Sequence, residues 1–404
     1  MNASKGNKGY ISGINGSLID VKGLEDTIKL HDLIKIEEYN IVGEVIQIYS
    51  DYLVAQCYEE TDELTLGQKV IGLYEPLSME LGPGLLGNIF DGIQRPLEEA
   101  FALFEEGFLK RGFDVKSLSR EKQWDFKPIS REGEHVNSGD IIGVLQETSL
   151  IEHRIMVPDN MSGTISFIVN EGKYTVDQEI YKITQDGNEK SFSMIQKWPI
   201  TKARPFKRRI NPEDPLVTGI RVIDLLFPVV KGGAVAVPGG FGTGKTVIQQ
   251  SLAKWCNADV IIFVGCGERG NEIADVLKEF TKIKDPKSGR PLLERIVLIA
   301  NTSNMPVSAR GASIFSGVTI AEYYRDMGYD VAVLADSTSR WAEALREISG
   351  LLEEMPAEEG YPAYLPSKLS GFYERAGYVI TKGKMSSGKE QDGSITIIGS
   401  VSPP

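Results

Sequence analysis

The sequence predicts a multidomain chain with an N-terminal β-barrel, an inserted β-rich domain and an α/β core that has a mainly parallel sheet. Up to about residue 183, short apolar runs alternate with turn residues, which is typical of closely spaced strands. From Gly219 onward, apolar runs alternate with amphipathic stretches, which indicates a parallel sheet with helices on both faces. The 404 residues are enough for two or three domains.

The first segment, 1–76, is expected to form a small closed barrel. The stretches 40–49 and 51–58 are its clearest strand candidates, because apolar residues recur at strand spacing between turn signals. Residues 77–112 are interpreted as a connection that belongs to the core, with a helix-like apolar pattern from Gly87 to Lys110.

The second β-rich block, 113–189, contains two half-similar hairpins, at 133–143 and 161–173. They resemble the barrel-sandwich fold of biotinyl and lipoyl carrier domains. A carrier would need an exposed lysine in the tight turn between the hairpins, and Met161-Ser162-Gly163 has no adjacent lysine. We therefore expect a structural insertion. The following proline-rich, basic stretch up to Pro215 is interpreted as a linker, with Lys207–Arg209 as a solvated connector. The core is expected to span 190–404.

The bulk composition limits the classes of function. A net charge of −12 argues against a nucleic-acid-binding surface. Cys57, Cys256 and Cys266 lack metal-ligand spacing and are expected to be buried thiols in a reducing compartment. The N-terminus has no signal-peptide core, and no apolar run approaches the roughly 20 residues of a membrane span. Any membrane role is therefore expected to go through partners.

One motif names a ligand class. The pattern G-x-x-x-x-G-K-[ST] of a phosphate-binding loop is matched at every position by Gly239, Gly240, Phe241, Gly242, Thr243, Gly244, Lys245 and Thr246. In such a loop, backbone N–H groups surround a chain of phosphates, Lys245 reaches the β- and γ-phosphates, and the Thr246 hydroxyl holds Mg²⁺.

The context of the motif supports a P-loop NTPase core. Ala234–Val237 is an apolar run that predicts a buried strand, and 245–256 predicts a helix. The helix N-terminus then directs unpaired N–H groups at the phosphates. The alternative is an ordinary glycine-rich turn, which this order of strand, loop and helix disfavours.

Two further motifs follow predicted strands, which are expected at 235–237, 260–264, 296–300 and 331–335. Ligands of parallel sheets bind at the carboxyl ends of strands. Glu268, after the second strand, is a candidate to orient a water for attack on the γ-phosphate, and Arg269 to stabilise phosphoryl charge. An equally weighted alternative makes Glu268 and Arg269 a local ion pair that caps the next helix. Asp336 ends the fourth strand and is a candidate Mg²⁺ ligand through water, and Arg340 is a candidate phosphate contact.

Taken together, these residues resemble the catalytic A-type chain of the vacuolar and archaeal-type rotary ATPases, which is also found in many bacteria. The resemblance runs along the whole chain and rests on segments 218–224, 239–246, 267–272, 300–306, 335–347, 359–364 and 402–404. The β-rich block resembles the extra "bulge" domain of that family.

The resemblance implies that the chain binds ATP or ADP with Mg²⁺ and hydrolyses or makes ATP as H⁺ or Na⁺ crosses a membrane. It assigns Lys245, Glu268, Arg269 and Arg340 to catalysis, and Thr246 and Asp336 to the metal. The implied partners are non-catalytic B-type subunits that alternate with this chain in an A3B3 ring and supply an arginine finger. Central and peripheral stalk subunits complete the complex at the cytoplasmic face of a membrane, and no nucleic acid is expected. The sequence leaves both the ion and the direction of the reaction open.

Some positions depart from the family pattern. Gly240 replaces the usual proline, and Gly311 and Leu351 stand where Glu and Arg are common. Related chains continue beyond Pro404 into a helical domain that supplies the adenine pocket and contacts the rotor. We expect that domain to be absent here and the chain to be a fragment. The alternatives are a homohexameric ATPase of the secretion or transcription-termination type, and a nucleotide-binding remnant without catalysis.

Overall fold

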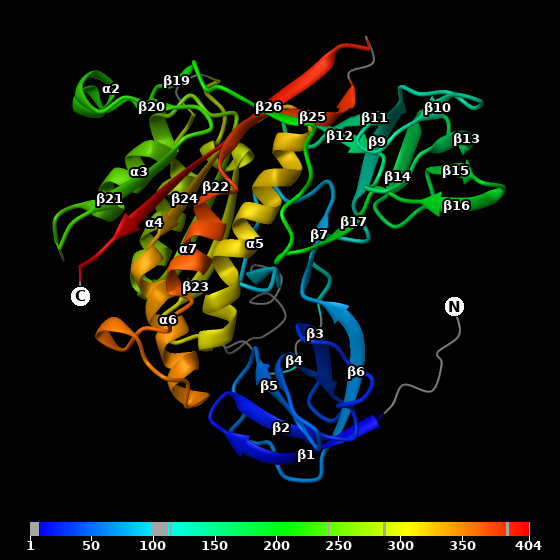
Figure 1. The fold of residues 1–404 in the computed structure, drawn as a ribbon. Coiled ribbons are helices and arrows are strands. Elements are labelled where there is room, and N and C mark those ends of the chain that lie inside the picture. The colour runs from blue at the N-terminus through cyan, green and yellow to red at the C-terminus, as the bar shows by residue number, and fades with distance from the viewer. Residues whose placement is uncertain are drawn as a thin grey trace.

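The computed structural model describes residues 8–97, 112, 115–240, 242–285, 288–384 and 388–403. Three parts are visible in Figure 1: a β-barrel below, an α/β core above it on one side and a β-rich domain on the other. The long helix α5 (Val307–Asp326) runs between them. This arrangement confirms the predicted fold class.

The N-terminal barrel is closed by six strands in the order β1-β2-β5-β4-β3-β6. Every second residue from Ile41 to Val45 is buried, so the strand alternation predicted from the sequence faces the barrel core. The strands are β1 (Lys8–Asn15), β2 (Leu18–Lys22), β3 (Asp32–Ile36), β4 (Ile41–Ile48), β5 (Leu53–Cys57) and β6 (Lys69–Pro76).

The connection after the barrel differs from its prediction. β7 (Ser78–Leu81) is followed by β8 (Ile89–Phe90), which pairs in parallel with a strand of the core sheet. The helix predicted to begin at Gly87 is therefore wrong at its start, because both β8 residues are buried at the sheet edge. Residues 98–110 of that predicted helix lie outside the described residues.

The β-rich domain consists of two four-stranded sheets, in the orders β10-β13-β15-β16 and β12-β11-β9-β14. Their inward side chains, including Trp124, Phe126 and Ile183, form one apolar core. The strands are β9 (Gln123–Pro128), β10 (His135–Val136), β11 (Ile141–Gln146), β12 (Glu152–Met156), β13 (Gly163–Ile168), β14 (Gly172–Thr175), β15 (Tyr181–Gln185) and β16 (Asn188–Phe192). β16 extends to Phe192, past the predicted end of this domain at residue 189. The exact domain boundaries stay predictions.

The stretch interpreted as a linker is ordered. β17 (Gln196–Pro199) pairs with β7, and β18 (Arg208–Ile210) joins the core sheet beside β25. Lys207 and Arg208 are exposed, as expected, but both pair with Glu390. Their exposure agrees with the interpretation as a solvated connector, and Arg208 also belongs to the edge strand β18 of the core sheet.

The core sheet has the order β18-β25-β26-β24-β22-β23-β8, and β21 also pairs with β26. The pairs are parallel except for β18 with β25 and β25 with β26. The strands that carry the predicted motifs are present, so the prediction of a mainly parallel sheet is confirmed. They are β21 (Ala234–Pro238), β22 (Val260–Glu268), β23 (Ile296–Thr302), β24 (Asp330–Asp336), β25 (Gly377–Lys384) and β26 (Glu390–Val401); a separate pair is β19 (Pro215–Leu216) with β20 (Val229–Val230).

Helices cover both faces of this sheet (Figure 1). Along β22, Ile261 and Phe263 pack toward α3 (Lys245–Trp255) and α4 (Gly270–Lys282). Val260, Ile262 and Val264 pack toward α5 and its neighbours. A strand with both faces covered must be apolar at every position, which explains the unbroken run in the sequence. Among the described residues, the other helices are α2 (Arg221–Leu226), α6 (Thr338–Leu351), α7 (Leu365–Tyr373) and the short 3₁₀ turns Leu292–Arg295 and Glu358–Gly360.

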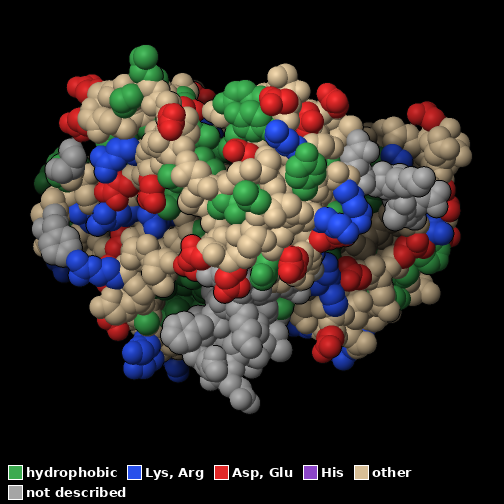
Figure 2. Space-filling view, turned by 90° about the horizontal axis from the view of Figure 1, so that it is seen from below, with side chains coloured by type: hydrophobic (Ala, Val, Ile, Leu, Met, Phe, Trp, Pro, Cys, Tyr) green, Lys and Arg blue, Asp and Glu red, His purple; other side chains and the backbone are tan. Residues whose placement is uncertain are grey.

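On the face seen from below, acidic and basic side chains are interspersed with separate hydrophobic groups (Figure 2). Within the part of the chain that the structure describes, none of the helices combines the length and apolar character that crossing a bilayer requires.

Candidate nucleotide site

The predicted phosphate loop joins β21 to α3, as its sequence context indicated. Gly242 and Gly244 have positive φ angles of 78° and 90°, and Gly244 is the residue at which α3 is capped. A side chain on Gly239 would collide with the Thr243 hydroxyl. These glycines are therefore required by the backbone path. Phe241 lies outside the described residues.

The lysine of the motif lies over its own loop. Lys245 Nζ donates to the carbonyl oxygens of Gly239 at 2.6 Å and of Gly240 at 2.8 Å. The Thr243 hydroxyl also donates to Gly240 O, at 2.8 Å. The ammonium is thus held next to the loop backbone, where phosphate oxygens could replace the carbonyl groups as its partners. Thr246 follows in the first turn of α3.

Asp336 is the last residue of β24 and is 2% exposed. Its Oδ1 accepts a hydrogen bond from Ser400 Oγ at 2.5 Å. Among the described residues, none donates to the equally buried Oδ2. An unpartnered buried carboxylate oxygen is costly, so this atom fits a site that is completed by a cation or by cation-bound water. The described residues contain no cluster of three or more His, Cys, Asp or Glu side chains that would hold a metal by themselves.

β26 connects Asp336 to the phosphate loop. Ala335 lies opposite Gly399 on β26, and Pro238 lies opposite Val401. Gly239 N also donates to Val401 O at 3.0 Å. Because Ser400 holds Asp336 and Val401 holds the start of the loop, the two motifs lie at adjacent positions on the same sheet edge.

Glu268 is the last residue of β22, whose residue Gly265 lies opposite Asp336 on β24. Burial, a hydrogen bond with the Glu272 side chain and the nearby charge of Asp336 raise the pKa of Glu268 from 4.5 to about 8. Two carboxyl groups can share a hydrogen bond only when one of them is protonated. Glu268 therefore retains its proton to a higher pH than an ordinary glutamate does.

The two predicted arginines are placed differently. The positive charge of Arg340 acts on Glu268 and lowers its pKa against the dominant effects. Its guanidinium also pairs with Glu343 at 2.8 Å, and its side chain is 52% exposed. Arg269 is exposed at the N-cap of α4 and makes no side-chain cap hydrogen bond there. The ion pair of Glu268 with Arg269 and the phosphate contact of Arg269 both stay predictions.

Sequence reasoning assigned no role to three residues around this site. Glu272 lies in the motif 267–272, but the sequence gives no signal for its contact with Glu268, because Glu268 ends β22 and the helix begins only at Gly270. Arg310, 9% exposed, lies in the first turn of α5 with its Cδ 3.3 Å from the position that a Cβ on Gly267 would take. Asn301 is fully buried at the end of β23, opposite Cys266. The sequence alone could not assign Arg310 or Asn301 to the site, because their positions depend on which residues of the sheet lie opposite each other.

Comparison with known proteins gives matches along nearly the whole chain. The ATP synthase alpha/beta family beta-barrel domain matches residues 11–73, the ATP synthase alpha/beta subunit barrel-sandwich domain matches 115–201, and the ATP synthase alpha/beta family nucleotide-binding domain matches 219–404. The A subunit of the A-type ATP synthase of Methanopyrus kandleri is 54% identical over 398 residues, and the V-type ATP synthase alpha chain of Acetivibrio thermocellus is 54% identical over 398 residues. The V-type ATP synthase alpha chain of Clostridium perfringens is 52% identical over 396 residues.

Each alignment covers 98% of this chain and 66% of the relative. The chain thus spans slightly less than two thirds of the length of these relatives. With three consecutive domain matches and more than half of its residues identical to those of named subunits, the chain belongs to the ATP synthase alpha/beta family, among its V-type and A-type alpha chains.

Proposed function

We propose that this chain is the catalytic nucleotide-binding subunit of a V/A-type rotary ATPase, which hydrolyses or makes ATP coupled to H⁺ or Na⁺ translocation. The observation that carries the proposal is the position of Glu268. Its carboxyl group lies at the carboxyl edge of the parallel sheet, within electrostatic reach of Asp336. The phosphate loop leaves the same edge.

Each residue of the site has a separate role in binding or catalysis. Backbone N–H groups of 239–244 and the Lys245 ammonium bind the phosphates of ATP or ADP. Thr246 and Asp336 hold Mg²⁺, directly or through water, and the ion would neutralise charge on the β- and γ-phosphates when bound. Glu268 orients and deprotonates the attacking water, for which a pKa near the working pH is favourable. Arg269 and Arg340 contact phosphate oxygens.

The partners follow from the family. The relatives are named as components of ATP synthases, which supports an alternating A3B3 ring whose B-type subunits supply an arginine finger. Central and peripheral stalk subunits then connect the ring to a membrane sector. The chain itself would lie peripherally at the cytoplasmic face. The names of the relatives favour this assembly over a homohexameric secretion or transcription-termination ATPase.

Glu268→Gln tests the central assignment. The change keeps the size of the side chain but removes its ability to accept a proton. In the ring assembled with the B-type subunit, we expect Mg-ATP to bind with an unchanged Kd, while turnover falls by about 100-fold or more. Asp275→Asn, an exposed position on α4, serves as the matched control and should leave both quantities unchanged. Undiminished turnover in Glu268→Gln would refute the assignment.

Lys245→Ala tests the phosphate loop separately. Removing the ammonium should weaken Mg-ATP binding by about tenfold or more, because a charge-assisted contact with phosphate is lost. Titration with a fluorescent ATP analogue measures this directly on the chain.

A second experiment separates the rotary assignment from the homohexameric alternative. Stimulation of turnover by the B-type subunit supports the rotary assignment, whereas stimulation by RNA supports the homohexameric alternative.

A further inference from the structure

A fully buried histidine joins the β-rich domain to the core. His153 lies on β12 and is 0% exposed. Its Nδ1 lies 2.7 Å from Glu147 Oε2, and its Nε2 lies 2.9 Å from the hydroxyl of Tyr323 on α5. Both ring nitrogens therefore have a hydrogen-bond partner: Glu147 in the β-rich domain and Tyr323 in the core.

Glu147 extends this junction to a third segment. Its Oε1 accepts from the amides of Gly84 and Leu86, at 2.8 Å and 3.2 Å, and the Tyr324 hydroxyl donates to the same carboxylate. Burial alone raises the pKa of Glu147, but His153 and the two amides outweigh burial and hold the pKa below its usual value. The carboxylate thus ties the connection after the barrel, the β-rich domain and α5 together.

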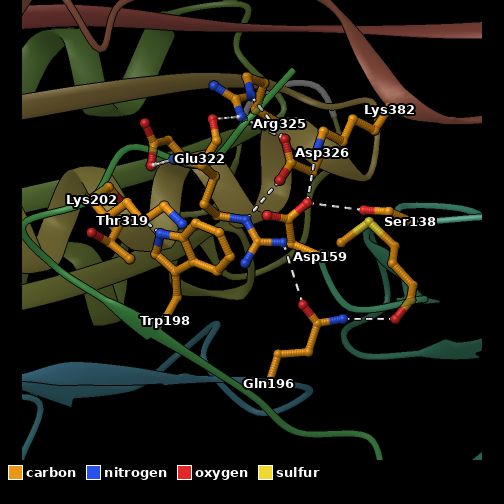
Figure 3. Close-up of polar contacts among 12 residues, drawn as sticks. Ser138, Asp159, Gln196, Trp198, Lys202, Thr319, Glu322, Arg325, Asp326 and Lys382 are labelled. Atoms are coloured by element: carbon orange, nitrogen blue, oxygen red, sulfur yellow. Dashed lines mark hydrogen bonds and ion pairs between the residues drawn. The ribbon is translucent and has the colours of Figure 1, made fainter. Parts of the chain in front are cut away.

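The last turn of α5 is held a second time. Arg204 Nε pairs with Asp326 at 2.7 Å. Beside it, Lys382 of β25 pairs with Asp159 of the β-rich domain at 2.6 Å, and Asp159 also accepts from Ser138 at 3.1 Å (Figure 3). Arg204 therefore fixes the carboxyl end of α5 to the segment that returns from the β-rich domain, and the Lys382–Asp159 pair joins the core sheet to the β-rich domain.

The N-terminal end of α5 lies beside residues 266–268, the turn that leads to Glu268. Arg310 in its first turn places its Cδ 3.3 Å from the position of a Cβ on Gly267. The carbonyl oxygen of Arg310 lies 3.6 Å from Cys266 Sγ. These contacts reach the two residues that precede Glu268.

Between its ends, α5 is closely packed against β22. The helix has 20 residues, which corresponds to a length of about 30 Å. A Cβ on Gly317, near its middle, would lie 2.5 Å from Val264 Cγ2. A close-packed helix has no room to move alone, so a displacement of its carboxyl end must be accommodated by β22, the strand that carries Glu268.

We infer that His153 is a positioning residue for Glu268. Through its hydrogen bond to Tyr323, it fixes α5 and thereby the turn 266–268. This makes the β-rich domain a support of the nucleotide site. The inference extends the proposed function of Glu268, but its structural part can be measured in the nucleotide-free chain.

Tyr323→Phe is the sharpest test, because it deletes only the hydroxyl that links His153 to α5. Hydrogen exchange followed by mass spectrometry should show amides of α5 and of 264–268 exchanging about three- to tenfold faster. Tyr329→Phe is the matched control. It removes a comparable link, from Tyr329 to Glu152 O at 2.6 Å, but at a residue beyond the end of α5, so exchange at 264–268 should not change.

Faster exchange confined to the β-rich domain, with 264–268 unchanged in Tyr323→Phe, would overturn the inference. A conservative pair adds a second check: His153→Gln should retain more protection at 264–268 than His153→Leu, because only Gln can hydrogen-bond to Tyr323. In the assembled ring, Tyr323→Phe should lower kcat with little change in KM. If Tyr323→Phe shows this exchange pattern but the ring assembled with the parent chain has no turnover, the proposed function fails and the structural inference stands.

Discussion

At the scale of single residues, a buried and a half-buried carboxylate show how surroundings decide chemistry. Glu147 accepts hydrogen bonds from two amides and a tyrosine beside His153, so it is stable as an anion. Glu268 faces Glu272 and the charge of Asp336, so burial and repulsion raise its pKa to about 8. The fold thus uses one carboxylate as a fixed structural charge and keeps the other able to exchange a proton.

The raised pKa of Glu268 predicts a pH-dependent stability. Between about pH 4.5 and 8 the folded chain retains a proton that the unfolded chain releases, so stability falls as pH rises through this window. Glu268→Gln cannot ionise. We expect it to be more stable than the parent by roughly 1–2 kcal/mol at pH 8.5, after allowing for solvent screening, and equal to it near pH 4. Urea unfolding at both pH values measures this, and parallel stability profiles would contradict it.

Gly267 predicts a second effect at this scale. Its φ is +73°, and a Cβ would lie 2.7 Å from Arg340 Cβ. We expect Gly267→Ala to cost about 1–3 kcal/mol of stability and to reduce turnover, because the turn before Glu268 must shift. Gly270→Ala is the control, since its Cβ meets nothing within 4 Å. Equal thermal midpoints for the two variants would show that the turn is not constrained.

At the scale of elements, the sequence predicted a strand or helix correctly where its formation depends on residues close by in the chain. The predicted strand 234–237 and helix 245–256 correspond to β21 and α3 within a residue, because glycine conformation and a helix start depend on neighbouring residues. The predicted burial of that strand is wrong, since Ala234 and Ala236 are exposed. β8 and β18 were not predicted as strands. Each exists only because a partner strand, β23 or β25, lies beside it.

The packing of α5 predicts opposite effects of the same substitution at two glycines. Gly317→Ala should destabilise the chain by about 1–3 kcal/mol, because the new methyl group would overlap with Val264. Gly311→Ala should stabilise it by about 0.5–1 kcal/mol, because the nearest atom, Ile348 Cδ1, lies at 3.8 Å and alanine favours the helix. Thermal unfolding of both variants checks the sign, and equal signs would refute this account of the packing.

At the scale of the whole molecule, buried ion pairs hold separate segments together. Arg375, which precedes β25, pairs with Glu322 of α5 at 2.5 Å and donates to Ile200 O at 2.8 Å. Both charged side chains are at most 5% exposed. The pair therefore links α5, the core sheet and the segment that returns from the β-rich domain.

Removing one member of this pair should be costly. We expect Glu322→Gln to lower stability by about 3–5 kcal/mol, because Arg375 would remain buried without its counter-charge. Glu390→Gln should cost less than about 1 kcal/mol, since that carboxylate is 41% exposed where it pairs with Arg208. Denaturant midpoints of the two variants decide the matter, and similar costs would contradict the role given to burial.

Local patterns in the sequence were enough to establish the ligand class, the order of the domains, the helix that begins at Lys245 and the strands that carry Glu268 and Asp336. These patterns are a glycine-rich loop before a helix, apolar runs and the residue at each strand end. The three-dimensional fold was needed to show that Asp336 Oδ2 has no donor among the described residues, that Glu272 lies against Glu268 and Arg310 against Gly267, and that His153 reaches α5. Those facts depend on strand register and domain docking, which bring together residues as far apart as His153 and Tyr323 and leave no periodic signal in the sequence.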